Sequence, residues 1–196
     1  QFRKKKNLWF EKFINLNRQE KPFFFERETN IKKIEKKINF KMFQNQNFVE
    51  YSELGLNYLK DISKIIKKNS GGLLLIDYGY TNKKMKDTLQ AVSNHKFANI
   101  LNNIGNVDIT HNISFNLFKN FVEKIGGLTS NLTTQKKFLI KMGIKQRAEI
   151  ISKKQNFLKK TDIYYRLNRL IDEKQMGTLF KVMLVKDKKN KFKFGF

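Results

Sequence analysis

The stretch that most constrains the fold is the short apolar run GGLLLIDYGY, residues 71–80, which opens on two glycines and reaches an acid. Its aliphatic residues follow one another without a polar interruption, which is typical of a strand covered on both faces in a parallel sheet. We therefore predict a buried β-strand with Asp77 near its carboxyl end. In α/β folds, ligand crevices open at this edge of the sheet.

The segment before this run predicts a helix. From Ser52 to Lys68 the aliphatic residues recur every three or four positions, Ser52 suits the N-cap, and lysines crowd the last turn. Gly71 and Gly72 are expected to supply the positive φ of the C-cap. A helix, a glycine turn and a buried strand in succession indicate an α/β fold.

The flanking segments predict a mixture of elements. Leu8 to Glu28 fits a β-hairpin, with the only proline, Pro22, at the edge of its second strand. Thr29 to Lys41 fits either a short amphipathic helix or a strand, and its pattern does not separate the two. The remaining predictions are a helix over Ile113–Ile125 closed by Gly126 and Gly127, a strand near Leu128–Thr133, one or two helices in Gln135–Phe157, a helix over Asp162–Ile171, a final strand in Gly177–Asp187, and a Lys/Phe tail that frays. The polar connection from Asn82 to Thr110 lacks periodicity, which is typical of a functional or disordered segment.

Composition excludes several classes of site. The 196 residues fit one ordinary domain, and no cysteine is present, so disulfides, thiolate metal centres and thiol catalysis are excluded. His95 and His111 are the only histidines and do not stand at a metal-ligand spacing. The sequence contains no apolar run of about twenty residues and no signal-peptide pattern. The cytoplasm is therefore the expected compartment.

The formal net charge of +24 has two readings. A clustered basic face would bind nucleic acid by releasing phosphate counterions. The lysines here are spread along the whole chain, and Lys, Asn, Ile and Phe together are the residues that AT-rich codons supply. We therefore favour base composition as the source of the charge, and the sequence argues against nucleic acid as the partner.

Local motifs leave the chemistry open. The ten glycines form neither a dinucleotide-binding nor a nucleotide-phosphate loop, and no nucleophile elbow is present. Asp77 and Asp87 fit a pair of catalytic carboxylates, but an acid at a strand end equally fits a cap on the following turn. A lone loop histidine such as His95 is more often a surface or hydrogen-bonding residue than a base.

Five blocks carry a resemblance to a known family. They are GGLLLIDYGY, KDTLQAVSNHKFANIL, GNVDITHNISFNLF, FLIKMGIKQRAEII and QMGTLFKVMLV, which stand in this order between about Phe48 and Val185. Together they resemble the carboxyl-terminal half of the MidA-like S-adenosylmethionine-dependent methyltransferases. That family includes the mitochondrial complex I assembly factor that methylates an arginine. The family usually has Pro-Gly where this chain has Asn103–Gly105, so the loop there departs from the pattern.

The resemblance implies a fold and an organisation. The family has a class I, Rossmann-like fold with a mostly parallel sheet, helices on both faces and an antiparallel last strand. The chain would then be a single domain, 1–196, with a hairpin insertion at 1–47, an α/β core at 48–187 and a basic tail at 188–196. The family binds S-adenosylmethionine through a glycine-rich loop and an acid that would lie upstream of Gln1. We therefore expect a fragment that is inactive alone and whose longer parent binds the cofactor.

The resemblance also suggests substrate-binding residues, at the strand end and in the loop that follows. These are Asp77, Tyr78, Gly79, Asp87, Thr88, Gln90, His95 and Asp108. In a protein-arginine methyltransferase, such acids would hold the guanidinium by charge-assisted hydrogen bonds. The expected partner is a protein substrate, with a homodimer as a further possibility. The alternative to methylation is a basic nucleic-acid-binding or non-catalytic assembly protein.

Overall fold

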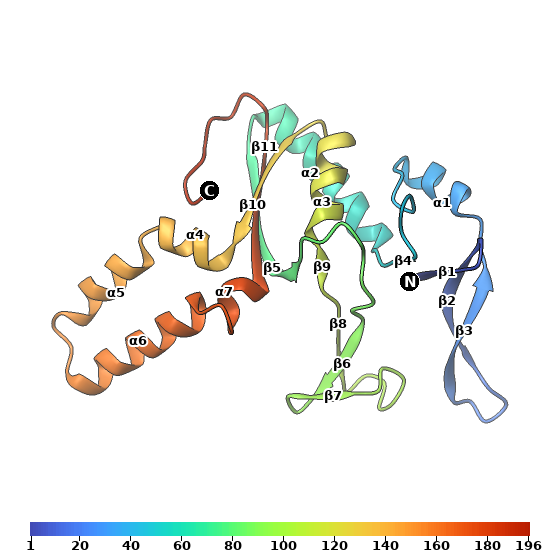
Figure 1. The fold of residues 1–196 in the computed structure, drawn as a ribbon, viewed down its shortest axis with the longest axis horizontal. Helices are drawn as coiled ribbons and strands as arrows, with labels where there is room; N and C mark the ends of the chain where they lie inside the picture. Colours follow the sequence, from blue (N-terminus) through green and yellow to red (C-terminus); the bar gives the residue numbers. More distant parts are fainter.

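The computed structural model describes all 196 residues and centres on a four-stranded sheet with the order β10-β11-β5-β9 (Figure 1). Its strands are β5 (Gly72–Tyr80), β9 (Ile113–Ser114), β10 (Thr129–Thr134) and β11 (Phe180–Lys186). β11 is antiparallel to both of its neighbours, as predicted for the last strand, and the two-residue β5–β9 ladder is parallel. The fold is therefore mixed α/β, but the parallel majority that we expected is not found among these strands.

The strand buried on both faces is β11, not β5. Val182 and Met183, on opposite faces of β11, are both fully buried. On β5, Leu73 and Leu75 pack into the core, whereas Leu74 is 46% exposed and Ile76 is 48% exposed. The prediction of a β5 covered on both faces is therefore wrong. The reason is that helices pack over one face of β5, while on the opposite face α4 (Gln135–Lys141) packs against β10 and β11.

Two helices cover the face of the central sheet that carries Leu73 and Leu75, and their caps explain where they begin and end. α2 (Glu53–Asn69) begins at the predicted N-cap, where Ser52 Oγ accepts a hydrogen bond from the Gly55 amide at 3.0 Å. It ends at Ser70, with φ of +52°, so the prediction that glycines supply the left-handed cap is wrong. The helix continues through Asn69, which brings the cap position to Ser70. α3 (Phe115–Lys124) starts two residues later than predicted because Ile113 and Ser114 form β9.

A second four-stranded sheet, with the order β3-β2-β1-β4, holds the amino-terminal residues. Its strands are β1 (Phe2–Lys5), β2 (Leu8–Leu16), β3 (Pro22–Glu28) and β4 (Phe48–Val49). β2 and β3 form the predicted antiparallel hairpin, and Pro22 opens the outer strand. The following α1 (Ile31–Ile38), capped by Asn30, shows that the segment with two possible assignments is a helix.

The connection after β5 folds into a third sheet, with the order β7-β6-β8. Its strands are β6 (Gln90–Ser93), β7 (Lys96–Ala98) and β8 (Asp108–Thr110). Of the two readings for this connection, functional or disordered, the disordered one is therefore wrong. Asn94 and His95 both have positive φ, at 49° and 60°, which is the geometry of a tight two-residue hairpin turn.

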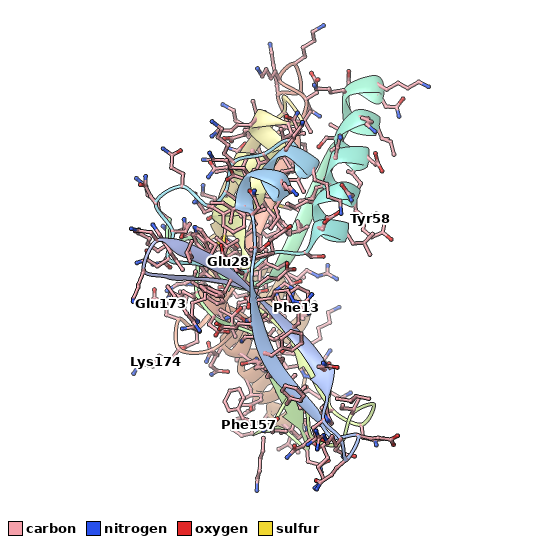
Figure 2. All side chains as sticks on the ribbon, turned by 90° about the vertical axis from the view of Figure 1, so that its right-hand side faces the viewer. Phe13, Glu28, Tyr58, Phe157, Glu173 and Lys174 are labelled. Atoms are coloured by element: carbon pink, nitrogen blue, oxygen red, sulfur yellow. The ribbon has the colours of Figure 1, made fainter.

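The carboxyl-terminal part forms a helical arm that projects from the central sheet, at the opposite end of the molecule from the β2–β3 hairpin (Figure 1). Its helices are α5 (Ile144–Ser152) and α6 (Phe157–Ile171), and α7 (Met176–Leu179) leads into β11. The segment 135–157 thus holds two helices, α4 and α5. α6 begins five residues earlier than predicted because Asn156 caps it. Phe13 on β2 and Phe157 at the start of α6 are labelled in Figure 2.

The core joins the two four-stranded sheets, and the tail packs against the molecule. One cluster includes Phe2 and Trp9 from the second sheet together with Phe121 and Met183 from the central part. At the end of the chain, the rings of Phe196 and Phe138 lie 5.4 Å apart, so the prediction of a fraying tail is wrong. The turn at Gly195, with φ of +84°, brings the last residue back onto α4. No helix has the length and apolar character needed to cross a membrane.

Candidate functional site

Asp77, Tyr78 and Gly79 lie near the carboxyl end of β5, as predicted. Asp77 Oδ1 accepts a hydrogen bond from the Tyr78 amide at 2.8 Å, so this carboxylate caps the backbone that follows it. The Tyr78 ring meets Phe180 edge to face, with 5.8 Å between ring centroids. At Gly79 an added Cβ would lie 2.2 Å from the Ile113 carbonyl oxygen. Glycine is therefore required there for β9 to approach β5.

Lys181 is a charged residue at this edge that sequence reasoning missed. Its ammonium group donates hydrogen bonds to the carbonyl oxygens of Gly79, at 2.9 Å, and of Thr178. Burial lowers the pKa of Lys181, because the charged form loses hydration. Lys181 pairs with Asp77 across the ladder, and a lysine at the start of an apolar strand was the available signal.

A second group of polar residues forms around Thr88. The Thr88 hydroxyl donates to Glu50 Oε1 and accepts a hydrogen bond from the Asn112 amide at 3.0 Å. The Thr88 amide lies 3.4 Å from Glu50 Oε2. Glu50 thus holds the predicted residue Thr88 in place, although no sequence pattern indicated it.

Asp87 joins the same group. Its carboxylate accepts hydrogen bonds from the Arg3 guanidinium at 3.3 Å and from the Gln1 side-chain amide at 2.7 Å. The Gln1 amide nitrogen also lies 2.5 Å from Glu50 Oε2, so it bridges the two carboxylates. We call Glu50, Asp87 and Thr88 the acidic cluster. Its two carboxylates already bind the Arg3 guanidinium and the Gln1 side-chain amide. The acidic cluster can therefore bind cationic groups and neutral hydrogen-bond donors.

The other predicted residues lie on the third sheet and not in the acidic cluster. Gln90 hydrogen-bonds to Thr110 across the β6–β8 ladder, at 3.2 Å. His95 occupies the β6–β7 turn, and Asp108 lies exposed on β8. Figure 1 shows this sheet extending away from the central one. The structure therefore divides the predicted residues among the β5 end, the acidic cluster and the third sheet.

The residues present do not fit S-adenosylmethionine. Three cavities, of about 990, 590 and 420 Å³, do not include Asp77, Tyr78 or Gly79 among their lining residues. The Asp77 carboxylate is used by its own backbone, and no glycine-rich loop precedes a helix in the chain. These three cavities thus form no cofactor pocket at the end of β5.

Comparison with known proteins places the chain among methyltransferases. Residues 1–134 match a family described as "Putative S-adenosyl-L-methionine-dependent methyltransferase". The protein arginine methyltransferase NDUFAF7, mitochondrial, of Xenopus tropicalis is 27% identical over 128 residues, which are 65% of this chain and 29% of that protein. The Danio rerio protein of the same name is 24% identical over 130 residues, 65% of this chain and 30% of that protein.

Two crystal structures from Burkholderia thailandensis share the fold over the whole chain. An uncharacterized protein matches with a TM-score of 0.79 and 19% identity, covering 100% of this chain and 53% of that one. A member of the same superfamily, bound to S-adenosyl-homocysteine, matches with a TM-score of 0.78 and 19% identity, covering 100% of this chain and 51% of that one.

The chain covers only part of the length of its relatives, and the family match covers most of the chain. It spans less than a third of the curated relatives that it matches and about half of the two related structures. The family match covers residues 1–134, more than half of the chain, and includes the acidic cluster and β5. The chain therefore belongs to this family of S-adenosyl-L-methionine-dependent methyltransferases.

Proposed function

We propose that this chain is the substrate-side, carboxyl-terminal part of a longer S-adenosylmethionine-dependent methyltransferase that modifies arginine in a protein. The name of the frog and fish relatives supports the acceptor, since both are protein arginine methyltransferases. The structure bound to S-adenosyl-homocysteine supports the cofactor, because that molecule is the demethylated form of S-adenosylmethionine. In the longer protein the cofactor would be held by residues outside this chain and would supply the methyl group.

The observation that carries the proposal is the guanidinium of Arg3 on the Asp87 carboxylate. An acceptor arginine presents the same group, and a carboxylate accepts its hydrogen bonds in a planar, charge-assisted geometry. Asp87 and Glu50 would together orient such a guanidinium near the end of β5. Orientation of the nucleophile supplies much of the rate in group transfer between two bound reactants.

The cellular role is proposed from the family alone. The family resemblance links the longer protein to respiratory complex I assembly. The relatives are named as mitochondrial proteins, which differs from the cytoplasmic compartment expected for this chain. The division into a 1–47 insertion, a 48–187 core and a 188–196 tail, and the possible homodimer, belong to the same proposal.

The test is methyl transfer by the protein produced with its upstream reading frame. Radiolabelled S-adenosylmethionine and an arginine-containing protein acceptor are the substrates. We expect Asp87→Asn and Glu50→Gln each to lower kcat/KM by about tenfold to a hundredfold, since hydrogen bonds to a charged group contribute roughly 1.5–3 kcal/mol. Asp77→Ala tests the predicted strand-end acid in the same assay.

Asp61→Asn is the matched control, because Asp61 is an exposed acid on α2 that pairs with Lys64. It should leave transfer unchanged. The 196-residue chain alone should show no heat of binding with S-adenosylmethionine in calorimetry. A longer protein that transfers no methyl group would overturn the activity, and cofactor binding by the chain alone would overturn the assignment as the substrate-side part.

A further inference from the structure

Two adjoining cavities form a groove beside the segment that follows β5. Their volumes are about 420 and 990 Å³, and they share six lining residues, among them Lys41, Gln44 and Lys84. Lys83, Lys84 and Met85, which begin three residues after β5, form one wall of the smaller cavity, and Asn116 and Asn120 of α3 belong to another. We call the two cavities together the basic groove.

Hydrogen bonds connect the walls of the basic groove. The Gln46 side-chain amide donates to the Lys83 carbonyl oxygen at 2.8 Å, and Gln46 Oε1 accepts from the Met85 amide at 2.9 Å. The Lys84 ammonium donates to the Asn45 carbonyl oxygen. These bonds hold the loop around residues 44–47 against the segment after β5. The groove is thus shaped before any ligand binds, which reduces the ordering cost of binding.

Lysines and neutral amides make up most of the polar side chains that line the basic groove. The smaller cavity is lined by four lysines and five Asn or Gln residues and by no acid. The larger cavity adds three lysines and one acid, Glu35. Glu35 Oε1 already accepts hydrogen bonds from the Met42 and Phe43 amides, at 2.8 and 3.1 Å. The basic groove thus has seven lysines and one carboxylate. The whole chain has 41 basic and 17 acidic residues, so the groove is more basic than the chain as a whole.

The shape and the aromatic residues favour a peptide over a nucleic acid. Single-stranded nucleic acid binds by stacking its bases on open aromatic rings. Trp9, Phe40 and Phe43 line the basic groove, but all three are buried in the core and offer no open face. Phe40 is further covered by Phe121, at 5.3 Å between ring centroids.

We propose that the basic groove binds an acidic segment of the protein substrate, with Asp and Glu side chains on the lysine ammonium groups. This inference rests on the proposed function, since the groove begins three residues after β5, near where the acceptor arginine would be held. Carboxylates beside the acceptor would meet Lys41, Lys83 and Lys124, while the arginine itself would reach Glu50 and Asp87. Opposite charges on neighbouring surfaces would then set the direction in which the substrate lies.

The test is direct binding of a fluorescein-labelled, glutamate-rich peptide to the 196-residue chain, followed by fluorescence anisotropy. We expect the affinity to fall with salt and to fall about threefold to a hundredfold in Lys41→Gln/Lys83→Gln/Lys124→Gln, since three exposed charge pairs contribute roughly 0.2–1 kcal/mol each. The matched control is Lys153→Gln/Lys154→Gln/Lys159→Gln, which removes three exposed lysines from the helical arm. This control should change the affinity by less than about twofold.

Each alternative outcome overturns the proposal in a recognisable way. Equal weakening in both triple variants would mean that the net charge, and not the basic groove, binds the peptide. Tighter binding of a single-stranded DNA probe, lost in the groove variant, would assign the groove to nucleic acid. The single variant Lys83→Gln, with its thermal midpoint measured alongside, excludes misfolding as the cause of a loss. Because no methyl transfer is measured, a failure here is separate from a failure of the proposed enzymatic function.

Discussion

Ser70 closes α2 in the left-handed region, where a residue with a Cβ atom is strained. It is one of eight non-glycine residues with positive φ, and its amide hydrogen-bonds to the Ile66 carbonyl oxygen. The left-handed conformation costs an L-residue roughly 1–2 kcal/mol, and glycine escapes most of that cost. We expect Ser70→Gly to raise the free energy of unfolding by about 0.5–1 kcal/mol in urea denaturation, after the loss from the more flexible unfolded chain.

Gly71 is the matched control for Ser70. Its φ is not positive, and a Cβ added there meets no atom within 4 Å. We expect Gly71→Ala to be neutral or to stabilise the protein by up to about 1 kcal/mol. Stabilisation by Ser70→Gly together with clear destabilisation by Gly71→Ala would contradict this description of the cap.

Tyr51 makes the stability of the chain depend on pH in the alkaline range. Burial, with smaller contributions from Glu53 and Glu11, raises the pKa of Tyr51 to about 12. In the unfolded chain the phenol has its ordinary pKa of 10.0, so the folded state holds the proton more tightly. The stabilising effect is fully present below pH about 10 and is lost as the pH rises towards about 12.

Tyr51→Phe should remove this part of the pH dependence. Urea denaturation at pH 9 to 11.5, roughly the window of the shift, would then show a shallower loss of stability in the variant than in the wild type. The difference in phenolate absorbance between the two proteins would report a transition near the upper end of that window. Parallel stability curves would show that Tyr51 titrates alike in the folded and unfolded chain.

The candidate site could be predicted from the sequence only where its residues are neighbours in the chain. Asp87 and Thr88 belong to one block, and both lie in the acidic cluster. Glu50 stands 38 residues before Thr88, and the two residues meet only in the folded chain, through the Thr88 amide and hydroxyl. The pairing of β1 with β4 sets Gln1 beside Glu50, and no local pattern encodes it. For Asp77 the structure shows the backbone cap, one of the two readings that its position allowed.

At the scale of elements, hydrophobic periodicity predicted where helices and strands lie better than it predicted which elements pack against them. The run over residues 72–77 was recognised as a strand, but its apolar character did not tell whether another layer would cover Leu74 and Ile76. β11 was predicted as a final strand, and its continuous burial follows from its place between β5 and β10. The third sheet was missed because its strands have only three or four residues and their stability comes from pairing with one another.

The helical arm should unfold separately from the core. α5 and α6 share a small apolar cluster of Ala148, Leu167 and Ile171, which is distinct from the main cluster. Leu167→Ala removes a buried side chain from it, which costs about 2–4 kcal/mol where the site cannot collapse. We expect amide hydrogen exchange to accelerate within the arm and to stay unchanged in β11.

Leu128→Ala is the contrasting variant, because Leu128 lies in the main cluster and is 2% exposed. It should accelerate exchange in β11, and also in the helices that cover it. If Leu167→Ala accelerated exchange equally in the arm and in β11, the arm would be part of the same cooperative unit as the core.

At the scale of the whole molecule, one apolar strip on the central sheet has no partner within this chain. Leu74 and Ile76 lie side by side on β5, with 46% and 48% of their surface exposed. On the edge of β5 that does not face β11, only Gly79 and Tyr80 pair with another strand, β9. The related structures extend over about twice the length of the segment that this chain matches. If the chain is the carboxyl-terminal part of a longer methyltransferase, the preceding residues would cover this strip and pair with the free edge of β5.

The double variant Leu74→Lys/Ile76→Lys tests this in two lengths of the protein. In the 196-residue chain both side chains face solvent, so the free energy of unfolding should change by no more than about 0.5 kcal/mol per site. In the longer protein the lysines would be buried without partners, and the loss should exceed about 3 kcal/mol. Ile150→Lys on the exposed face of α5, where Ile150 is 66% exposed, should be neutral in both lengths. The free energy of unfolding is measured by thermal and urea denaturation. Equal and small losses of stability in the two lengths would mean that the strip stays open in the longer protein.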